Sequence, residues 1–263
     1  MKRPISMLNF THDYVRHLSS NLQSAALHTP RQNQVLALLP DELYERLEPE
    51  LELMELPSGT TLYGPGDVRT YAYFPITCIV SILYDTENGK SSQIAMTGND
   101  GFVGVVIAMG AESNMMHTAV QTSGFAYRVK ATVIKKFMQE DAFQHAILLY
   151  TQLLITQMGL TAVCNRHHSI DQQFCRWLLL SLDRLNHMNL DITHEQISNI
   201  LGVRREGITQ AARRFQTANA IHYSRGHMQI LDRVALEDGV CECYQVFKKE
   251  SDRLFSHAGG KSY

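Results

Sequence analysis

Residues 191–215 constrain the fold more than any other part of the chain, because they encode two short helices separated by a glycine. Thr193 and Gln196 have the spacing of a capping box, which predicts that the first helix begins just after Thr193. Ser198 is small and lies four residues before Gly202. Two crossing helices need a small side chain where they approach and a glycine in the tight turn. The segment therefore predicts a helix-turn-helix.

The second helix of this pair is expected from about residue 204 to residue 217. At about 100° per residue, its apolar and polar side chains separate onto opposite sides. The apolar side carries Ile208, Ala211, Ala212 and Phe215. The polar candidates are Arg204, Arg205, Glu206, Thr209, Gln210, Arg213 and Arg214. Arginine suits guanine, glutamine suits adenine and glutamate accepts from cytosine, so this side predicts an interface for double-stranded DNA.

A hairpin is predicted directly after these helices. Two short β-prone runs flank residues 224–226, and Arg225 and His227 should lie near the tip, close to a phosphate. Thr193, at the start of the first helix, completes the candidate contacts. Residues 204–233 contain six arginines but only two acidic residues, whereas the whole chain has a net charge of −2. Any nucleic-acid surface must therefore be local.

Residues 57–129 have a different texture, with recurrent glycines between short β-prone runs. This pattern predicts an antiparallel sandwich or barrel. The expected strands are 60–63, 71–74, 78–84, 92–96, 119–122 and 125–129. Residues 87–90 contain Asn-Gly, which favours a type I′ hairpin turn. Before these strands, the leucines of residues 41–56 suggest short helices, and residues 1–31 form an arm or a short helix.

A long helix is predicted after residue 131, where glycine almost disappears. Its apolar residues follow alternating steps of three and four: Phe143, Ile147, Tyr150, Leu154, Met158 and Thr161. This stripe must be buried, either against its own domain or as a parallel two-helix dimer seam; we expect the seam. A second helix is expected over residues 170–186.

No signal peptide or run of about eighteen apolar residues is found, which predicts a cytoplasmic protein without a membrane span. The five cysteines are widely scattered, which argues against a disulfide framework and favours reduced thiols. Cys241 and Cys243 are too close together for the usual structural zinc pair, which leaves two to four residues between its cysteines, so no metal site is predicted.

A glycine-rich β domain, a long helix and a winged helix-turn-helix resemble the CRP/FNR superfamily over residues 36–235. Its most specific parts are residues 202–206 followed by Ile208, the strand pair at 73–75 and 80–81, and the glycines of 98–104. The resemblance implies an α+β fold: an antiparallel, jelly-roll-like β-roll sensor, a dimerisation helix and a C-terminal winged helix-turn-helix. It further implies a homodimer on a two-fold symmetric DNA site, with RNA polymerase as a possible partner.

These observations divide the chain into an arm (1–31), a β-roll domain (32–135), a dimerisation helix (136–168), a winged helix-turn-helix domain (169–240) and a tail (241–263). In the family's recognition helix an Arg-Glu pair and a later arginine read bases. Arg205 and Glu206 match the pair, but Gln210 stands at the position of the later arginine. The preferred base at that step should differ.

The sensor departs further from the family's cyclic-nucleotide cassette. Val105 stands at the position of the ribose-binding glutamate, and Asn114 stands near the position of the phosphate-binding arginine. A buried cyclic phosphate would lack its charged partner, so cAMP control in the usual way is not expected. An unknown effector would use the candidate pocket Gly101, Val103, Gly104, Val105, Asn114, Met115 and Met116. No cofactor is predicted, and Cys78 is more simply a small core residue than a haem ligand.

Three hypotheses follow. The first is a homodimeric, sequence-specific DNA-binding transcription regulator, and the second is a small-ligand sensor whose winged helix binds protein. The third, an enzyme, is disfavoured because the sequence contains no Walker loop, no GxSxG and no paired carboxylates in a glycine-rich setting, so no catalytic residues are assigned.

Overall fold

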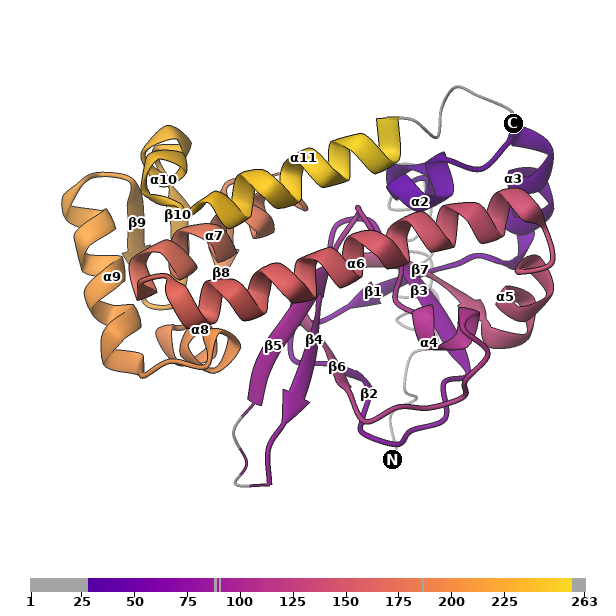
Figure 1. The fold of residues 1–263 in the computed structure, drawn as a ribbon, viewed down its shortest axis with the longest axis horizontal. Helices are drawn as coiled ribbons and strands as arrows, with labels where there is room; N and C mark the ends of the chain where they lie inside the picture. The colour runs from indigo at the N-terminus through magenta and orange to yellow at the C-terminus, as the bar shows by residue number, and fades with distance from the viewer. Residues whose placement is uncertain (1–27, 88, 90, 186, 257–263) are drawn as a thin grey trace, which may run out of the picture.

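A computed structural model describes residues 28–87, 89, 91–185 and 187–256. The expected arm at 1–31 therefore lies almost entirely outside the described residues. Seven strands form a β-roll of two antiparallel sheets, with orders β1-β7-β3 and β2-β6-β4-β5 (Figure 1). The strands are β1 (Glu52–Leu56), β2 (Thr61–Tyr63), β3 (Tyr71–Pro75), β4 (Ile79–Asp85), β5 (Ser91–Thr97), β6 (His117–Thr122) and β7 (Gly124–Lys130).

All six strands expected from the sequence are present. Short helices were expected over residues 41–56, and this expectation is wrong for the last five residues. Residues Glu52–Leu56 form β1, which pairs antiparallel with β7. The backbone of this leucine-rich segment pairs with β7, whose residues lie 68 to 76 positions later in the chain. Local spacing cannot reveal such a partner. Of the expected turn at 87–90, positions 88 and 90 lie outside the described residues.

Short helices surround the roll. They are η1 (Pro30–Gln32), α2 (Gln34–Ala37), α3 (Asp41–Leu47), η2 (Glu48–Glu50), α4 (Val105–Ala108) and α5 (Ala131–Phe137). Asn33 caps α2 with its side-chain oxygen, and its amide nitrogen donates to the carbonyl oxygens of Pro75 and Gly101, each at 2.8 Å. One buried side chain therefore ties the segment before the roll to the end of β3 and to the loop after β5.

The long helix α6 (Asp141–His167) runs along the roll and packs one side into it. Phe143, Ile147 and Tyr150 are at most 3% exposed, and Leu154 is 8% exposed. The hydroxyl groups of Tyr150 and Thr97 lie 2.7 Å apart, and Gln157 Oε1 accepts from the Met96 amide at 2.7 Å. The predicted dimer seam is therefore buried within its own chain from Phe143 to Leu154, and its last two residues, Met158 and Thr161, are partly buried. The apolar surface on which α6 packs belongs to the roll, so the spacing of residues within the helix could not predict it.

The C-terminal domain follows α6. It contains α7 (Ile170–Leu182), β8 (Asn189–Asp191), α8 (His194–Leu201), α9 (Arg205–Thr217), β9 (Ile221–Ser224), β10 (His227–Ile230) and α10 (Arg233–Gly239). Its three strands form a small antiparallel sheet of order β8-β10-β9. Phe174, Trp177 and Leu178 of α7 are at most 2% exposed and join the core beneath α8 and α9.

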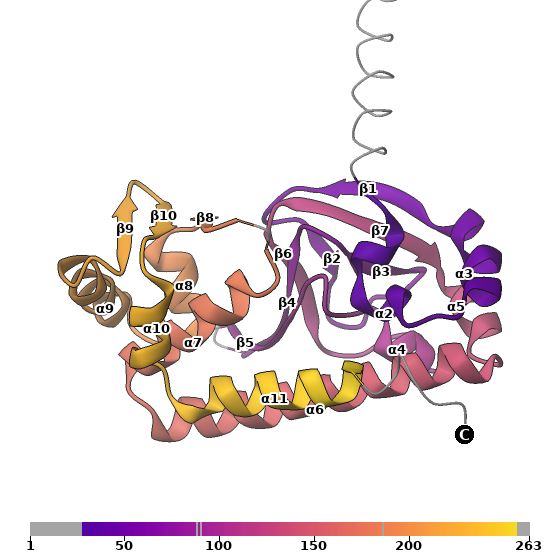
Figure 2. The same cartoon turned by 90° about the horizontal axis from the view of Figure 1, so that it is seen from above.

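The expected tail contains a fifteen-residue helix, α11 (Glu242–Ser256). It lies beside α6 in both views of Figures 1 and 2. Tyr244, Phe247 and Leu254 are buried on its inner side, and Gln152 of α6 donates to Glu250 at 3.0 Å. The helix thus returns from the C-terminal domain toward the roll. Its apolar side covers part of α6.

Helix α6 is also long and apolar enough by composition to cross a membrane, the one such helix among the described residues. A core helix of a soluble protein passes the same test. The contacts of α6 with the roll and with α11 account for the apolar residues on its inner side.

Candidate DNA-binding site

The helix-turn-helix forms where the sequence predicts it. The Thr193 hydroxyl accepts from the Gln196 amide at 3.2 Å, and the Gln196 side chain accepts from the Thr193 amide at 2.8 Å, so both halves of the capping box are present. Helix α8 then ends at Gly202, whose φ of 66° lies in the left-handed region. Ser198 is 5% exposed at the close approach of the two helices.

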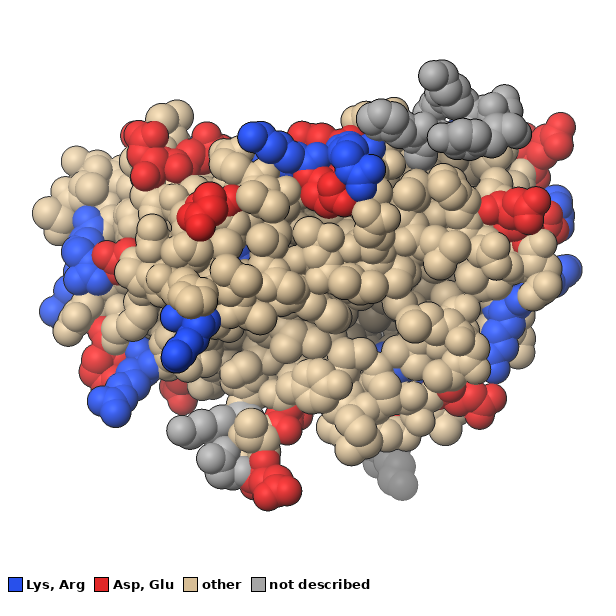
Figure 3. Space-filling model, in the orientation of Figure 1, with Lys and Arg blue, Asp and Glu red and all other residues tan. Residues whose placement is uncertain are grey.

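Helix α9 has one buried side and one exposed side. Ile208 and Ala211 are fully buried and Ala212 is 3% exposed, so this side is anchored to the domain core. Exposed on the surface are Arg204, Arg205, Glu206, Gln210, Arg213, Arg214 and Thr217. Figure 3 shows basic side chains gathered at the end of the molecule that α9 occupies. A helix held in this way presents hydrogen-bonding groups on a rigid support.

Three of the predicted contact residues in the helix-turn-helix itself already have partners within the chain. Arg214 donates to Asp171 at the start of α7, with its Nε 2.7 Å from Oδ2. Thr209 is partly buried, and its hydroxyl donates to the Arg205 carbonyl oxygen at 3.0 Å. Thr193 uses its hydroxyl to cap α8. These three side chains stabilise the motif through contacts within the chain. The other polar residues of α9 are exposed: Arg205, Glu206, Gln210 and Arg213.

The wing is a two-residue hairpin between β9 and β10. Its central residues Arg225 and Gly226 have φ angles of 51° and 87°, as a type I′ turn requires. Arg225 is exposed at the tip. His227 Nδ1 lies 2.6 Å from Asp191 Oδ1, and both side chains are exposed. The tip of the wing therefore carries the exposed positive charge of Arg225, while His227 lies beside an acidic group.

The structure adds His194, which sequence reasoning did not select. Its ring stacks on Tyr223 of the wing with centroids 4.1 Å apart, and its Nδ1 lies 3.2 Å from the Thr209 hydroxyl. Partial burial and the nearby positive charges of Arg205 and Arg213 lower its pKa below the usual value. His194 thus connects α8, α9 and the wing. In the sequence, only its position next to Thr193 pointed to this role.

The residues predicted to line an effector pocket lie on two segments, one around the start of α4 and one before β6. Gly101 and Gly104 are buried, and an added Cβ would collide with Tyr150 at the first and with Phe102 at the second. Val103 is 3% exposed, and Val105 is the first residue of α4. The interior beside these residues is therefore filled by aromatic side chains.

Asn114, Met115 and Met116 lie along the loop before β6, and Met116 packs against the cluster that contains Phe102. Met115 is 66% exposed, and Asn114 accepts a hydrogen bond from Arg69 Nη2. The guanidinium of Arg69 is 4.4 Å from the Tyr63 ring centroid, and the residue is 6% exposed. An arginine therefore reaches the Asn114 position from another segment, although none occurs between residues 91 and 127. Val105 still supplies no carboxylate for a ribose.

Residues 172–238 match the family model of the Crp-like helix-turn-helix domain. Solved structures similar to the chain include FixK2 from Bradyrhizobium japonicum, with 14% identity, a TM-score of 0.61, and coverage of 73% of this chain and 98% of that one. A CRP-family transcriptional regulator from Thermus thermophilus has 13% identity, a TM-score of 0.60 and coverage of 71% and 95%. The c-di-GMP responsive global regulator CLP from Xanthomonas campestris has 15% identity, a TM-score of 0.57 and coverage of 73% and 99%. No curated protein sequence matches the chain.

The fold and the matched domain are those of a class of proteins, the DNA-binding regulators of transcription. More particularly, the chain has the CRP/FNR fold, an N-terminal β-roll followed by a long helix, and it carries a Crp-like helix-turn-helix at its C-terminal end. The similar structures are 13–15% identical to the chain and establish its fold.

Proposed function

We propose that this protein binds a two-fold symmetric DNA site as a homodimer and reads its sequence with α9. The observation that carries the proposal is the exposed side of α9, where Arg205, Glu206, Gln210 and Arg213 are supported by the buried Ile208 and Ala211. In such motifs, the N-terminal residues of the recognition helix contact base edges. Arg204 and Arg225, which are both exposed, would contact phosphates on either side.

The dimer is proposed to form through the outer side of α6. Leu148 and Ile155 are 55% and 64% exposed, and Ala162 is also exposed, so these residues fall at seven-residue intervals on one open face. Gly159 lies between them, and an added Cβ there would meet nothing within 4 Å. A seven-residue repeat of apolar positions is the pattern by which two helices pack as a coiled coil. This stripe replaces the buried one that the sequence alone suggested.

We further propose that the protein works without cAMP bound in the usual way. The β-roll interior at Gly101 and Gly104 is filled by Tyr150 and Phe102. Val105 and Asn114 stand where a cyclic nucleotide would need a carboxylate and a guanidinium. Arg69 is already engaged with Asn114 and Tyr63. An effector, if one is used, would differ in chemistry from a cyclic nucleotide.

A non-enzymatic, cytoplasmic role beside RNA polymerase completes the proposal, supported by the regulators whose fold the chain shares. The test is selection of bound sequences from random DNA, followed by titration at several salt concentrations. We expect an enriched inverted repeat and a steep decrease in affinity with salt, because arginines displace counterions. If no sequence is enriched and binding is insensitive to salt, the wing and α9 serve another partner, such as a protein.

A further inference from the structure

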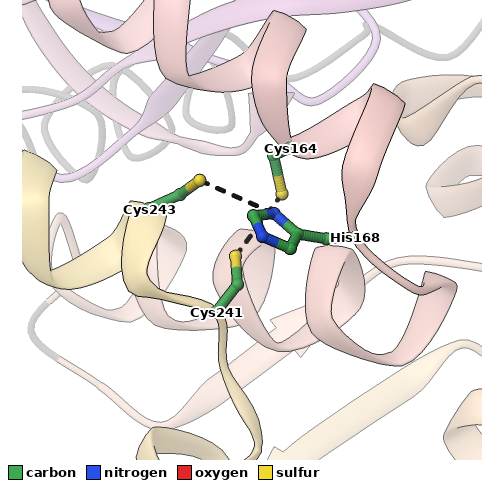
Figure 4. A group of neighbouring side chains, drawn as sticks. All are labelled: Cys164, His168, Cys241 and Cys243. Carbon is green, nitrogen blue, oxygen red and sulfur yellow. Dashed lines mark hydrogen bonds between the residues drawn. The ribbon is translucent and has the colours of Figure 1, made fainter.

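Four side chains that can bind metals meet where α6 ends and α11 begins (Figure 4). Cys164 and His168 lie one turn apart at the end of α6, and Cys241 and Cys243 bracket the first residue of α11. The three cysteines are at most 3% exposed. Sequence reasoning did not find this group, because its two halves are separated by more than seventy residues and Cys241-x-Cys243 is not a usual zinc pair.

The distances among the four ligand atoms suit a tetrahedral ion. Cys164 Sγ lies 3.6 Å from Cys241 Sγ, and Cys243 Sγ lies 3.7 Å from His168 Nδ1. All four atoms are within 4.8 Å of one another. Zinc bonds of about 2.3 Å to sulfur and about 2.0 Å to nitrogen require edges of roughly 3.5–3.8 Å in a tetrahedron. The two shortest contacts already have this length.

The imidazole of His168 is oriented so that one of its nitrogen atoms could bind a metal ion. Its Nε2 lies 3.3 Å from a carboxylate oxygen of Glu242, while Nδ1 faces Cys243. A proton held on Nε2 by the carboxylate leaves the lone pair of Nδ1 free for a metal. Metal-bound histidines usually donate their other N–H to such an acceptor. Glu242 stands between the two cysteines in the sequence, so one short segment supplies two ligands and this support.

A buried positive charge stands beside the group. Arg176 of α7 is 7% exposed, and its charge interacts with Cys164, Cys241 and Cys243. Its Nη2 donates to the uncharged hydroxyl of Thr161 at 3.1 Å, and its Nε has no hydrogen-bond partner within the described residues. Three thiolates, a neutral imidazole and a divalent ion carry one net negative charge. Arg176 would balance that charge.

We propose that Cys164, His168, Cys241 and Cys243 bind one Zn²⁺ ion in a closed, four-ligand structural site. Four protein ligands leave no open position for a substrate, which distinguishes a structural from a catalytic zinc site. The ion would fasten the start of α11 to the end of α6, next to the junction with α7. It would thereby tie the helix-turn-helix domain to the long helix of the sensor. The proposal is independent of which DNA site the protein binds.

The test uses the full chain purified under reducing conditions without added chelator. Elemental analysis is expected to find one zinc per chain. Titration of the metal-free protein with Co²⁺ should give the intense thiolate-to-cobalt absorption and the d–d bands of a tetrahedral site. Cys241→Ala should abolish both, whereas Cys78→Ala should change neither, because Cys78 is equally buried but lies in the roll. Glu242→Gln should weaken zinc binding about tenfold.

A second measurement does not depend on any variant folding. All five thiols are buried, so each should react slowly with a thiol reagent in the wild-type protein. A zinc chelator should accelerate the reaction of Cys164, Cys241 and Cys243 and leave Cys78 and Cys175 unchanged. The proposal is overturned if Co²⁺ gives no tetrahedral spectrum and the five thiols react alike with and without chelator. It is equally overturned if the metal-free protein carries a Cys164–Cys241 disulfide that persists under mild reduction and prevents Co²⁺ binding.

Discussion

Arg184 forms a buried, bidentate ion pair with Asp100 across the boundary between the β-roll and the C-terminal domain. Arg184 Nε donates to Oδ1 at 3.0 Å and Nη2 lies 2.6 Å from Oδ2, with side-chain exposures of 2% for Arg184 and 12% for Asp100. Asp100 follows β5, and Arg184 follows α7. The amide of Gly98 also donates to Asp100 Oδ1, at 3.0 Å. Each charge is therefore satisfied only while the two domains stay in this arrangement.

Removing one member of this pair should destabilise the protein strongly. We expect Arg184→Ala to lower the free energy of unfolding by about 3–5 kcal/mol, because it leaves the Asp100 carboxylate buried without its partner. Denaturant titration measures the loss. Lys135→Ala, which breaks the exposed pair with Glu112, is the matched control and should cost at most about 1 kcal/mol. The double variant Asp100→Asn, Arg184→Met should recover part of the loss; equal effects of Arg184→Ala and Lys135→Ala would contradict this account.

Substitutions in the recognition helix and in the wing should change DNA binding in different ways. Arg205→Ala should cost about 1–3 kcal/mol of base discrimination at one position of each half-site, because that side chain is proposed to contact a base edge. Arg225→Ala should weaken all sequences similarly and reduce the salt slope by about one per subunit. Competition binding with single-base variants of the selected site separates the two effects.

Arg214→Ala serves as the comparison for both, since Arg214 is held by Asp171 on the flank of α9. It should leave base preference nearly unchanged. A uniform loss of affinity in Arg205→Ala, with preference intact, would argue that Arg205 contacts only the phosphate backbone.

The outer stripe of α6 should control the oligomeric state. Ile155→Glu is expected to raise the dimer dissociation constant at least about 100-fold, because each seam would bury unpaired carboxylates at a cost of several kcal/mol. Met109→Glu changes an equally exposed side chain, 74% exposed on the roll, and should leave the dimer intact. Sedimentation velocity over a range of concentrations distinguishes these results. A dimer that survives in Ile155→Glu with unchanged affinity would place the interface elsewhere.

Acid should loosen the contact between α8 and the wing. The pKa of His194 is lowered in the folded protein by partial burial and by Arg205 and Arg213. Between the folded and unfolded pKa values of His194, the unfolded chain binds more protons than the folded chain. The contribution of His194 to stability is therefore complete above the unfolded pKa, about 6.5, and it decreases as the pH falls through the folded pKa. His194→Gln should therefore show a flatter stability profile below pH of about 6.5 than the wild type in thermal melts. Parallel profiles would show that His194 titrates normally.

Local signals explain why the winged helix-turn-helix was predictable. The capping box at Thr193 and Gln196, the left-handed Gly202 and the separation of Ile208 from Arg205 around one helix are all set within a few residues. The strands of the roll were visible for the same reason, except β1, whose pairing with β7 is distant in sequence. The proposed base-reading side chains follow from the same helical geometry.

The sequence by itself determined the helix-turn-helix and its wing, six of the seven strands of the roll and the polar side of α9, because capping, turn formation and side-chain periodicity act over a few residues. Only the tertiary structure decided which side of α6 remains open, since the stripe of Phe143, Ile147 and Tyr150 is apolar enough to pack on either a sheet or a second helix. It also decided that the expected tail folds back along α6. That return brings Cys241 to Cys164, a meeting of distant residues that depends on packing and not on spacing.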